Sequence, residues 1–103
     1  MHAQVEARLS QVAELCRKHG VRQLFLFGSA TGDGYQPGKS DIDLLVEFQP
    51  APPAGHADNY FGLLEDLESL LGSRVDLVEL DPIRNPYLRR SIEATKVPIY
   101  DAA

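Results

Sequence analysis

Two aspartates stand two residues apart at the start of an apolar run, and this spacing suits metal chemistry. Asp41 and Asp43 flank Ile42, and residues two apart in a strand point to the same face. Their carboxylates would therefore lie side by side and repel one another unless a cation lies between them. Oxygen ligands of this kind suit Mg²⁺, which binds one or two carboxylates together with substrate phosphates.

A third carboxylate and a Gly-Ser pair fit the same site. Asp76 lies between Val75 and Leu77, and it would reach the same patch if its strand lies beside the Asp43 strand. Three carboxylates around phosphate oxygens would support two-metal phosphoryl or nucleotidyl transfer. Gly28 would let the backbone approach a phosphate, and Ser29 could donate a hydrogen bond to it.

The elements that must position these residues alternate between helices and strands. The side chains expected to face inward from the second helix share a helical spacing, and they are Phe61, Leu64, Leu67 and Leu71. This alternation indicates one sheet covered by helices. We predict helices over 3–19, 58–71 and 85–95, strands over 21–27, 41–48, 74–80 and 97–100, and loops over 28–40 and 49–56.

Length and charge limit the possible functions. The 103 residues predict one domain, 1–103, with a single small core. The net charge of −5 argues against free-standing nucleic-acid binding, which depends on neutralising phosphates. Cys16 is the one cysteine, so no internal disulfide forms. Because neither a signal peptide nor a membrane-length apolar run is found, we expect a cytoplasmic protein without a membrane span.

The segments that carry these residues resemble a known family. Phe27-Gly28-Ser29 followed by the run 40–48 resembles the signature of the minimal nucleotidyltransferases, in the DNA polymerase beta-like nucleotidyltransferase superfamily. The resemblance continues through 74–78, where the family carries a third carboxylate, and through the tail 88–100. It therefore spans nearly the whole chain.

The resemblance implies a fold and a set of site residues. The fold would be α+β, a two-layer α/β nucleotidyltransferase fold with a mixed sheet of about four strands and about three helices. Asp41, Asp43 and Asp76 would be the catalytic and Mg²⁺-binding residues. ATP would be the substrate, and the residues that contact the nucleotide would be Gly28, Ser29 and Lys39, the one basic residue of the loop.

The resemblance also implies a protein partner. Many members are antitoxins that pair with a HEPN-type ribonuclease toxin and transfer AMP from ATP to one of its tyrosines, which implies a hetero-oligomer. Two alternatives remain: an antitoxin that acts by binding alone, and a nucleotidyltransferase with a small-molecule or RNA acceptor. The loop 30–40 is one residue longer than is usual in the family and lacks arginine, whereas the three aspartates favour an enzyme.

Overall fold

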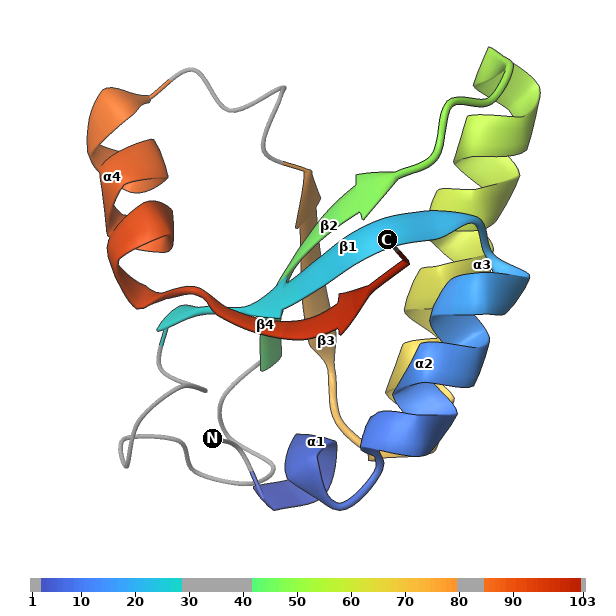
Figure 1. Ribbon diagram of the computed structural model, residues 1–103, viewed down its shortest axis with the longest axis horizontal. Helices are drawn as coiled ribbons and strands as arrows, with labels where there is room; N and C mark the ends of the chain where they lie inside the picture. Colours follow the sequence, from blue (N-terminus) through green and yellow to red (C-terminus); the bar gives the residue numbers. More distant parts are fainter. Residues whose placement is uncertain (1–2, 29–41, 80–84, 103) are drawn as a thin grey trace.

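The computed structural model describes residues 3–28, 42–79 and 85–102, which form one sheet with helices on both of its faces (Figure 1). Helices and strands follow one another in the predicted order. Their bounds are α1 Ala3–Glu6, α2 Leu9–Lys18, β1 Val21–Leu26, β2 Ile42–Phe48, α3 Pro53–Leu71, β3 Val75–Glu79, α4 Pro86–Thr95 and β4 Val97–Asp101.

The sheet is mixed, and its strand order is β3-β2-β1-β4. β1 runs antiparallel to both of its neighbours, whereas β2 and β3 are parallel and are joined through α3. β4 lies at the edge of this sheet, as Pro98 predicts, because proline cannot donate a ladder hydrogen bond. The predicted α+β fold with a mixed sheet of about four strands is therefore confirmed for the described residues.

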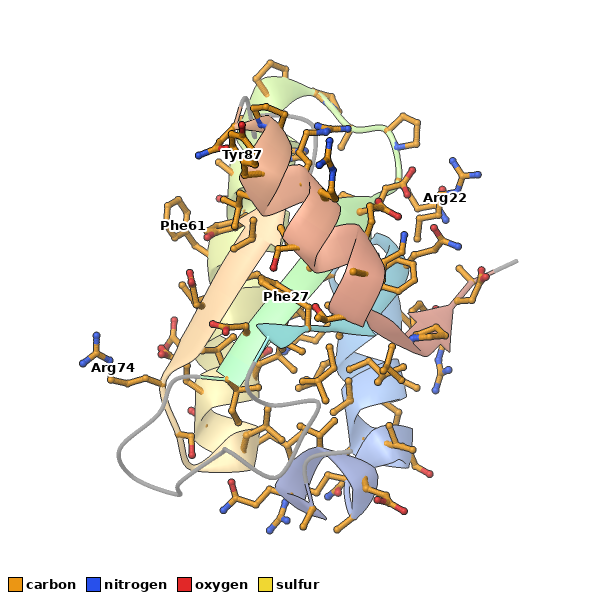
Figure 2. All side chains as sticks on the ribbon, turned by 90° about the vertical axis from the view of Figure 1, so that its left-hand side faces the viewer. Arg22, Phe27, Phe61, Arg74 and Tyr87 are labelled. Atoms are coloured by element: carbon orange, nitrogen blue, oxygen red, sulfur yellow. The ribbon has the colours of Figure 1, made fainter. Side chains whose placement is uncertain are left out.

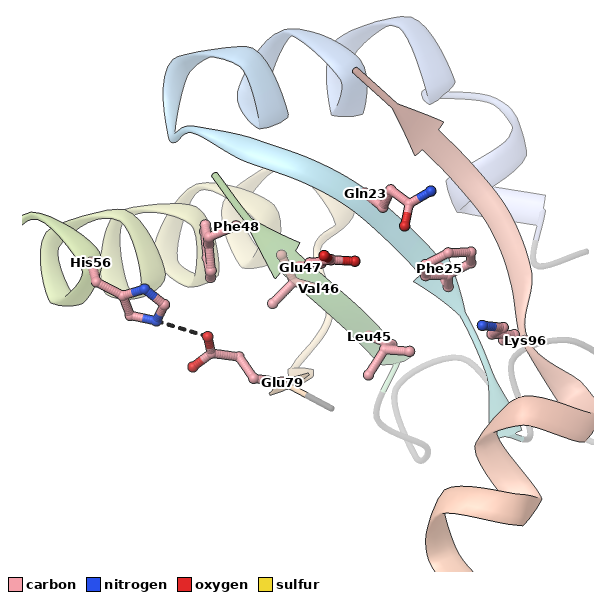
Figure 3. Close-up of a pocket in the computed structure, with 9 residues that line it drawn as sticks. All are labelled: Gln23, Phe25, Leu45, Val46, Glu47, Phe48, His56, Glu79 and Lys96. Carbon is pink, nitrogen blue, oxygen red and sulfur yellow. Dashed lines mark ion pairs between the residues drawn. The ribbon is translucent and has the colours of Figure 1, made fainter. Parts of the chain in front are cut away.

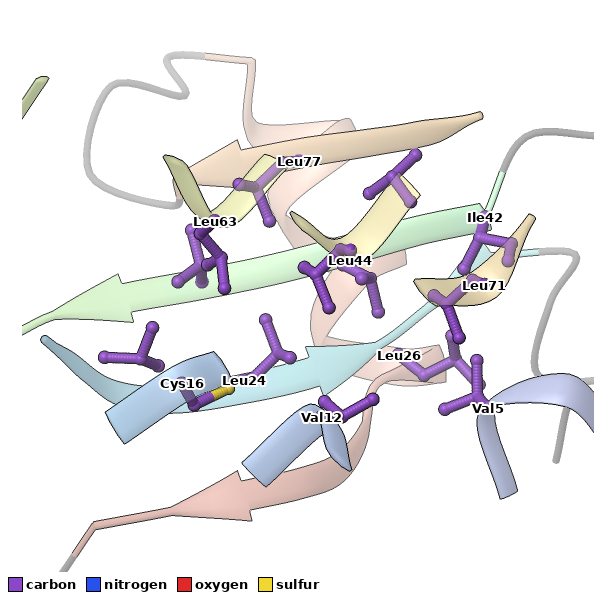
Figure 4. Packing of buried hydrophobic residues seen from close by; sticks show 14 residues of the cluster. Val5, Val12, Cys16, Leu24, Leu26, Ile42, Leu44, Leu63, Leu71 and Leu77 are labelled. Carbon is purple, nitrogen blue, oxygen red and sulfur yellow. The ribbon is translucent and has the colours of Figure 1, made fainter. Parts of the chain in front are cut away.

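The main core lies between the sheet and the helices α2 and α3 (Figure 4). Leu24 and Leu26 of β1 and Ile42 and Leu44 of β2 are all fully buried there. Alternate residues of each strand point to this face, so the period of two in the sequence is the period of the core. From the helices, Val12, Cys16, Leu63, Leu67 and Leu71 complete the packing.

α4 packs against part of the opposite face. Ile92 of α4 forms a smaller apolar cluster with Phe27 and Leu45, and Figure 2 looks onto this side of the molecule. The helix begins as predicted: the Asn85 side chain accepts hydrogen bonds from the backbone of the first turn, and Pro86 follows it. Among the described residues, α4 is therefore the helix that covers part of this face.

Two predicted helix boundaries are wrong. The helix predicted over 3–19 is divided by a turn at Ala7 and Arg8, which gives the described residues a fourth helix. Neither residue is a glycine or proline, so no local signal marks this break. α3 begins at Pro53 rather than Asp58, because a proline in the first turn has a suitable φ and has no N–H to leave unpaired. In the part of the chain that the structure describes, no helix is long and apolar enough to cross a membrane.

The predicted inward face of the second long helix is also wrong at one position. Phe61 is 64% exposed and points outward in Figure 2. Its ring lies edge-on to the ring of Tyr60. The buried stripe is instead Leu63, Leu67 and Leu71. Because each helical residue turns by about 100°, Phe61 lies nearly opposite Leu63. Leu67 and Leu71 are buried as predicted, and Leu64 is partly buried against the core.

Candidate active site

Asp43 and Asp76 lie side by side on neighbouring parallel strands. They are register partners of β2 and β3, between the pairs Ile42–Val75 and Leu44–Leu77. Since those flanking residues point into the main core, both aspartates point to the opposite face of the sheet, the face that carries α4. This is the relation that a shared carboxylate site requires.

The backbone of Gly28 lies close to the Asp43 carboxylate. Its φ is +68°, a conformation that side chains disfavour, and a Cβ placed there would lie 2.6 Å from Oδ2 of Asp43. One residue earlier, the N–H of Phe27 donates to the carbonyl of Asp43 at 3.1 Å. The position therefore requires glycine for its backbone and for the close approach of a carboxylate.

Thr95 joins α4 to the same turn, a contact that the sequence analysis missed. The Gly28 N–H donates to Oγ1 of Thr95 at 3.3 Å, and the Thr95 hydroxyl donates to the carbonyl of Ser91 at 3.0 Å. The second bond follows a common pattern, in which a threonine within a helix bonds the carbonyl four residues earlier. The first bond joins residues 67 apart, and only the tertiary structure reveals it.

Three of the predicted site residues lie outside the described residues: Ser29, Lys39 and Asp41. Their roles stay predictions. Asp41 directly precedes Ile42, the first residue of β2. Within residues 3–28, 42–79 and 85–102, no group of three or more histidine, cysteine or acidic side chains could hold a metal ion. The two described carboxylates are hard oxygen donors, which fit Mg²⁺ better than a soft metal.

Tyr60 of α3 contacts β3 next to Asp76. Its hydroxyl donates to the carbonyl of Leu77 at 2.6 Å. Burial raises the pKa of Tyr60, and the negative charges of Asp76 and Glu79 raise it further. The hydroxyl is therefore protonated at neutral pH and stays a donor.

A cavity of about 260 Å³ lies farther along the same face of the sheet (Figure 3). Phe25 and Leu45 line its floor, and His56 and Glu79 form an ion pair of 2.7 Å at one side. Lys96 lies 4.6 Å from the centre of the Phe25 ring. The lining does not include either aspartate, although Leu45 is two residues from Asp43 and points to the same side. The cavity therefore extends the aspartate face along β2.

Comparisons with known sequences show the family of the chain. A family model described as a nucleotidyltransferase domain matches residues 9–99. A "putative protein adenylyltransferase" of Methanocaldococcus jannaschii is 40% identical over 93 residues, which cover 82% of this chain and 91% of that protein. The protein adenylyltransferase MntA of Thermococcus cleftensis is 43% identical over 65 residues, 63% of this chain and 62% of that protein.

Solved structures share the fold. A "putative minimal nucleotidyltransferase" superposes with a TM-score of 0.74 at 34% identity, covering 91% of both chains. A toxin–antitoxin structure with AMP-PNP has a TM-score of 0.66 at 25% identity, covering 91% of this chain and 73% of that one. The complex of a tri-AMPylated Shewanella oneidensis HEPN toxin with its MNT antitoxin has a TM-score of 0.62 at 21% identity, covering 94% and 72%, and shows the fold alone.

Proposed function

Because the chain belongs to the nucleotidyltransferase domain family and is a nucleotidyltransferase of the minimal kind, we propose that it is an antitoxin-type protein adenylyltransferase. It would transfer AMP from ATP to a tyrosine hydroxyl of a cognate HEPN ribonuclease and so neutralise it. The observation that carries this proposal is the register of Asp43 with Asp76 beside Gly28. The names of the relatives and the AMP-PNP complex support the reaction class and the nucleotide.

The carboxylates would hold the nucleotide through Mg²⁺. Asp41, Asp43 and Asp76 are the residues proposed to bind the ion. A magnesium ion bound there would neutralise charge on the triphosphate. Gly28 has no side chain to block a phosphate, and we assign the remaining phosphate contacts to Ser29 and Lys39.

The transfer itself needs a base and an open path to the phosphate. Asp76 is exposed, so it can accept the proton of an approaching tyrosine hydroxyl. The tyrosine oxygen then forms a bond to the α-phosphorus, the bond from that phosphorus to the bridging oxygen breaks, and pyrophosphate leaves. The added AMP would place bulk and negative charge on the ribonuclease.

The partner is inferred from the charge of the chain and from its structural neighbours. Its net charge of −5 suits a partner with a basic RNA-binding surface and disfavours direct contact with RNA. The toxin–antitoxin structure with AMP-PNP, at 25% identity, supports a toxin as the partner. The proposed assembly is therefore a hetero-oligomer.

Intact-mass spectrometry tests this proposal. The chain is co-purified with a HEPN protein encoded beside it, then incubated with ATP and Mg²⁺. We expect the partner to gain the mass of one or more AMP groups at tyrosine and to lose ribonuclease activity. Asp43→Asn should abolish the gain, whereas the control Glu47→Gln, on the same strand and face, should retain it.

The other outcomes separate the alternatives. A partner that is silenced without a mass gain would establish neutralisation by binding alone. A chain that neither binds nor modifies a HEPN protein would contradict the antitoxin hypothesis, and a small-molecule or RNA acceptor would then be sought.

A further inference from the structure

The strand that carries Asp76 is the outer strand of the described sheet. β3 has β2 on one side, and the Ile42 N–H donates to the carbonyl of Arg74 at 2.9 Å. Because backbone groups of a strand point alternately to its two sides, residues 74, 76 and 78 bond toward β2. The backbone groups of Val75 and Leu77, which flank Asp76, therefore point to the outer side.

α3 supplies a partner to each side of Asp76 at this outer edge. The Val75 N–H donates to Oε2 of Glu68 at 3.0 Å, and the Leu77 carbonyl accepts from the Tyr60 hydroxyl at 2.6 Å. Both hydrogen bonds are partly buried. The two residues that flank Asp76 are thus each bonded to α3, while its register partner, Asp43, lies on β2.

The geometry of α3 explains how one helix reaches both places. Tyr60 and Glu68 are eight residues apart, so they lie about 80° from one another around the helix, on the half of it that faces β3. The later helix residue meets the earlier strand residue, because the helix and β3 run in opposite directions. Tyr60 is fixed further, since its ring packs on the main core and against Phe61.

Capping an outer strand has a general use, because exposed strand edges pair with other chains. Edge protection alone would not require the two bonds to lie beside Asp76 rather than elsewhere on β3. Here the two bonds fall on its immediate neighbours, and the Asp76 carboxylate itself is exposed and has its register partner in Asp43. The relative position of the two aspartates therefore depends on the sheet bonds on one side and on α3 on the other.

We propose that Tyr60 and Glu68 are positioning residues that hold β3 from its outer edge and so keep the Asp76 carboxylate level with that of Asp43. The inference rests on the proposed function for its catalytic consequence, but the hold on the strand does not depend on any activity. Neither side chain touches the substrate in this role; both act through the backbone of β3.

Amide exchange measured by NMR tests the hold directly. Glu68→Met removes the acceptor at similar size, so exchange of the Val75 amide should speed up about tenfold or more. Glu68→Gln keeps an oxygen acceptor and should restore slow exchange. Glu65→Met, on the same helix but exposed, is the matched control and should leave the Val75 amide unchanged.

Transfer kinetics test the catalytic consequence in the full complex. Tyr60→Phe and Glu68→Met should each lower kcat about tenfold while the KM for ATP changes little, and Glu68→Gln should recover most of kcat. Thermal melts of each variant are the control, and we expect each to be folded at the assay temperature. In a variant that combines Tyr60→Phe with Glu68→Met, the cross-strand NOEs between residues 43 and 76 should weaken.

Each contrary result has a distinct meaning. Unchanged exchange at Val75 in Glu68→Met would show that Glu68 does not hold β3. Faster exchange with unchanged kcat would show that the bonds protect the strand edge but do not position Asp76. If the wild-type chain transfers no AMP, the proposed function fails. The exchange and NOE measurements then still decide whether α3 positions Asp76.

Discussion

Side chains of β2 point alternately to the two faces of the sheet, and the two faces differ in function. Ile42 and Leu44 point into the main core and are fully buried beneath α2 and α3. Asp43 and Glu47 point the other way, where α4 covers only part of the sheet. A single strand thus contributes to stability on one face and to the candidate site on the other. Adjacent substitutions should consequently have opposite effects.

The largest effect on stability is expected on the face of β2 that packs into the main core. Leu44→Ala removes a fully buried side chain from the centre of the core and leaves a cavity. The free energy of unfolding should fall by about 2–5 kcal/mol, a large part of what a small domain has. Urea denaturation measures this loss. A loss below about 1 kcal/mol would show that this face does not dominate stability.

A substitution at Asp43, one residue earlier, should instead lower activity without lowering stability. Asp43→Asn keeps the shape of the side chain but removes a charge proposed to hold the metal, so AMP transfer should fall at least about a hundredfold. The unfolding free energy should stay the same or rise slightly, because two like charges in register repel one another. Transfer assays and melting curves on one preparation check both halves; wild-type transfer would place the chemistry elsewhere.

Two glycines separate backbone strain from site geometry. Gly28 and Gly72 have φ of +68° and +65°, so alanine at either should cost roughly 1–2 kcal/mol of stability. Only at Gly28 would the new Cβ lie 2.6 Å from the Asp43 carboxylate, whereas nothing lies within 4 Å at Gly72. Gly28→Ala should therefore impair AMP transfer strongly and Gly72→Ala hardly at all. Equal losses of transfer in the two variants would contradict this interpretation.

The smallest effect is expected in the pH dependence of stability, at the contact between α2 and α3. Hydrogen bonds from His19 and then Lys18 hold the pKa of Asp66 below its ordinary value of 3.8. A folded pKa below the unfolded one stabilises the protein above the unfolded pKa, and this contribution is lost as pH falls through the folded value. Asp66→Asn should make the urea midpoint less sensitive to pH below about 4, with transfer unchanged. Identical acid sensitivity in the two proteins would contradict this.

The sequence predicts most of what depends on short-range pattern. The period of two in β2 predicts which residues face the main core and that Asp43 points away from it. Asn85 followed by Pro86 predicts the start of α4, and Gly72 predicts the end of α3. These features are local, because a cap, a left-handed glycine or an alternation involves only a few neighbouring residues.

Features that depend on long-range packing are not predictable in this way. The adjacent leucines of α3 fit two helical phases, and only packing on the sheet decides that Leu63 is buried and Phe61 exposed. The Thr95 bond to Gly28 and the bonds of Tyr60 and Glu68 to β3 join segments whose contact no local pattern indicates. The roles of Asp41, Ser29 and Lys39 stay predictions from the sequence.

The position of the label that ATP leaves on the HEPN partner tests the central claim most directly. The complex is incubated with ATP labelled at either the α- or the γ-phosphate, using wild-type chain, Asp43→Asn and Glu47→Gln. We predict α-label on the partner with wild-type and Glu47→Gln, none with Asp43→Asn, and no γ-label with any of them. Retained γ-label, or undiminished α-label with Asp43→Asn, would contradict adenylyl transfer from the aspartate face of β2.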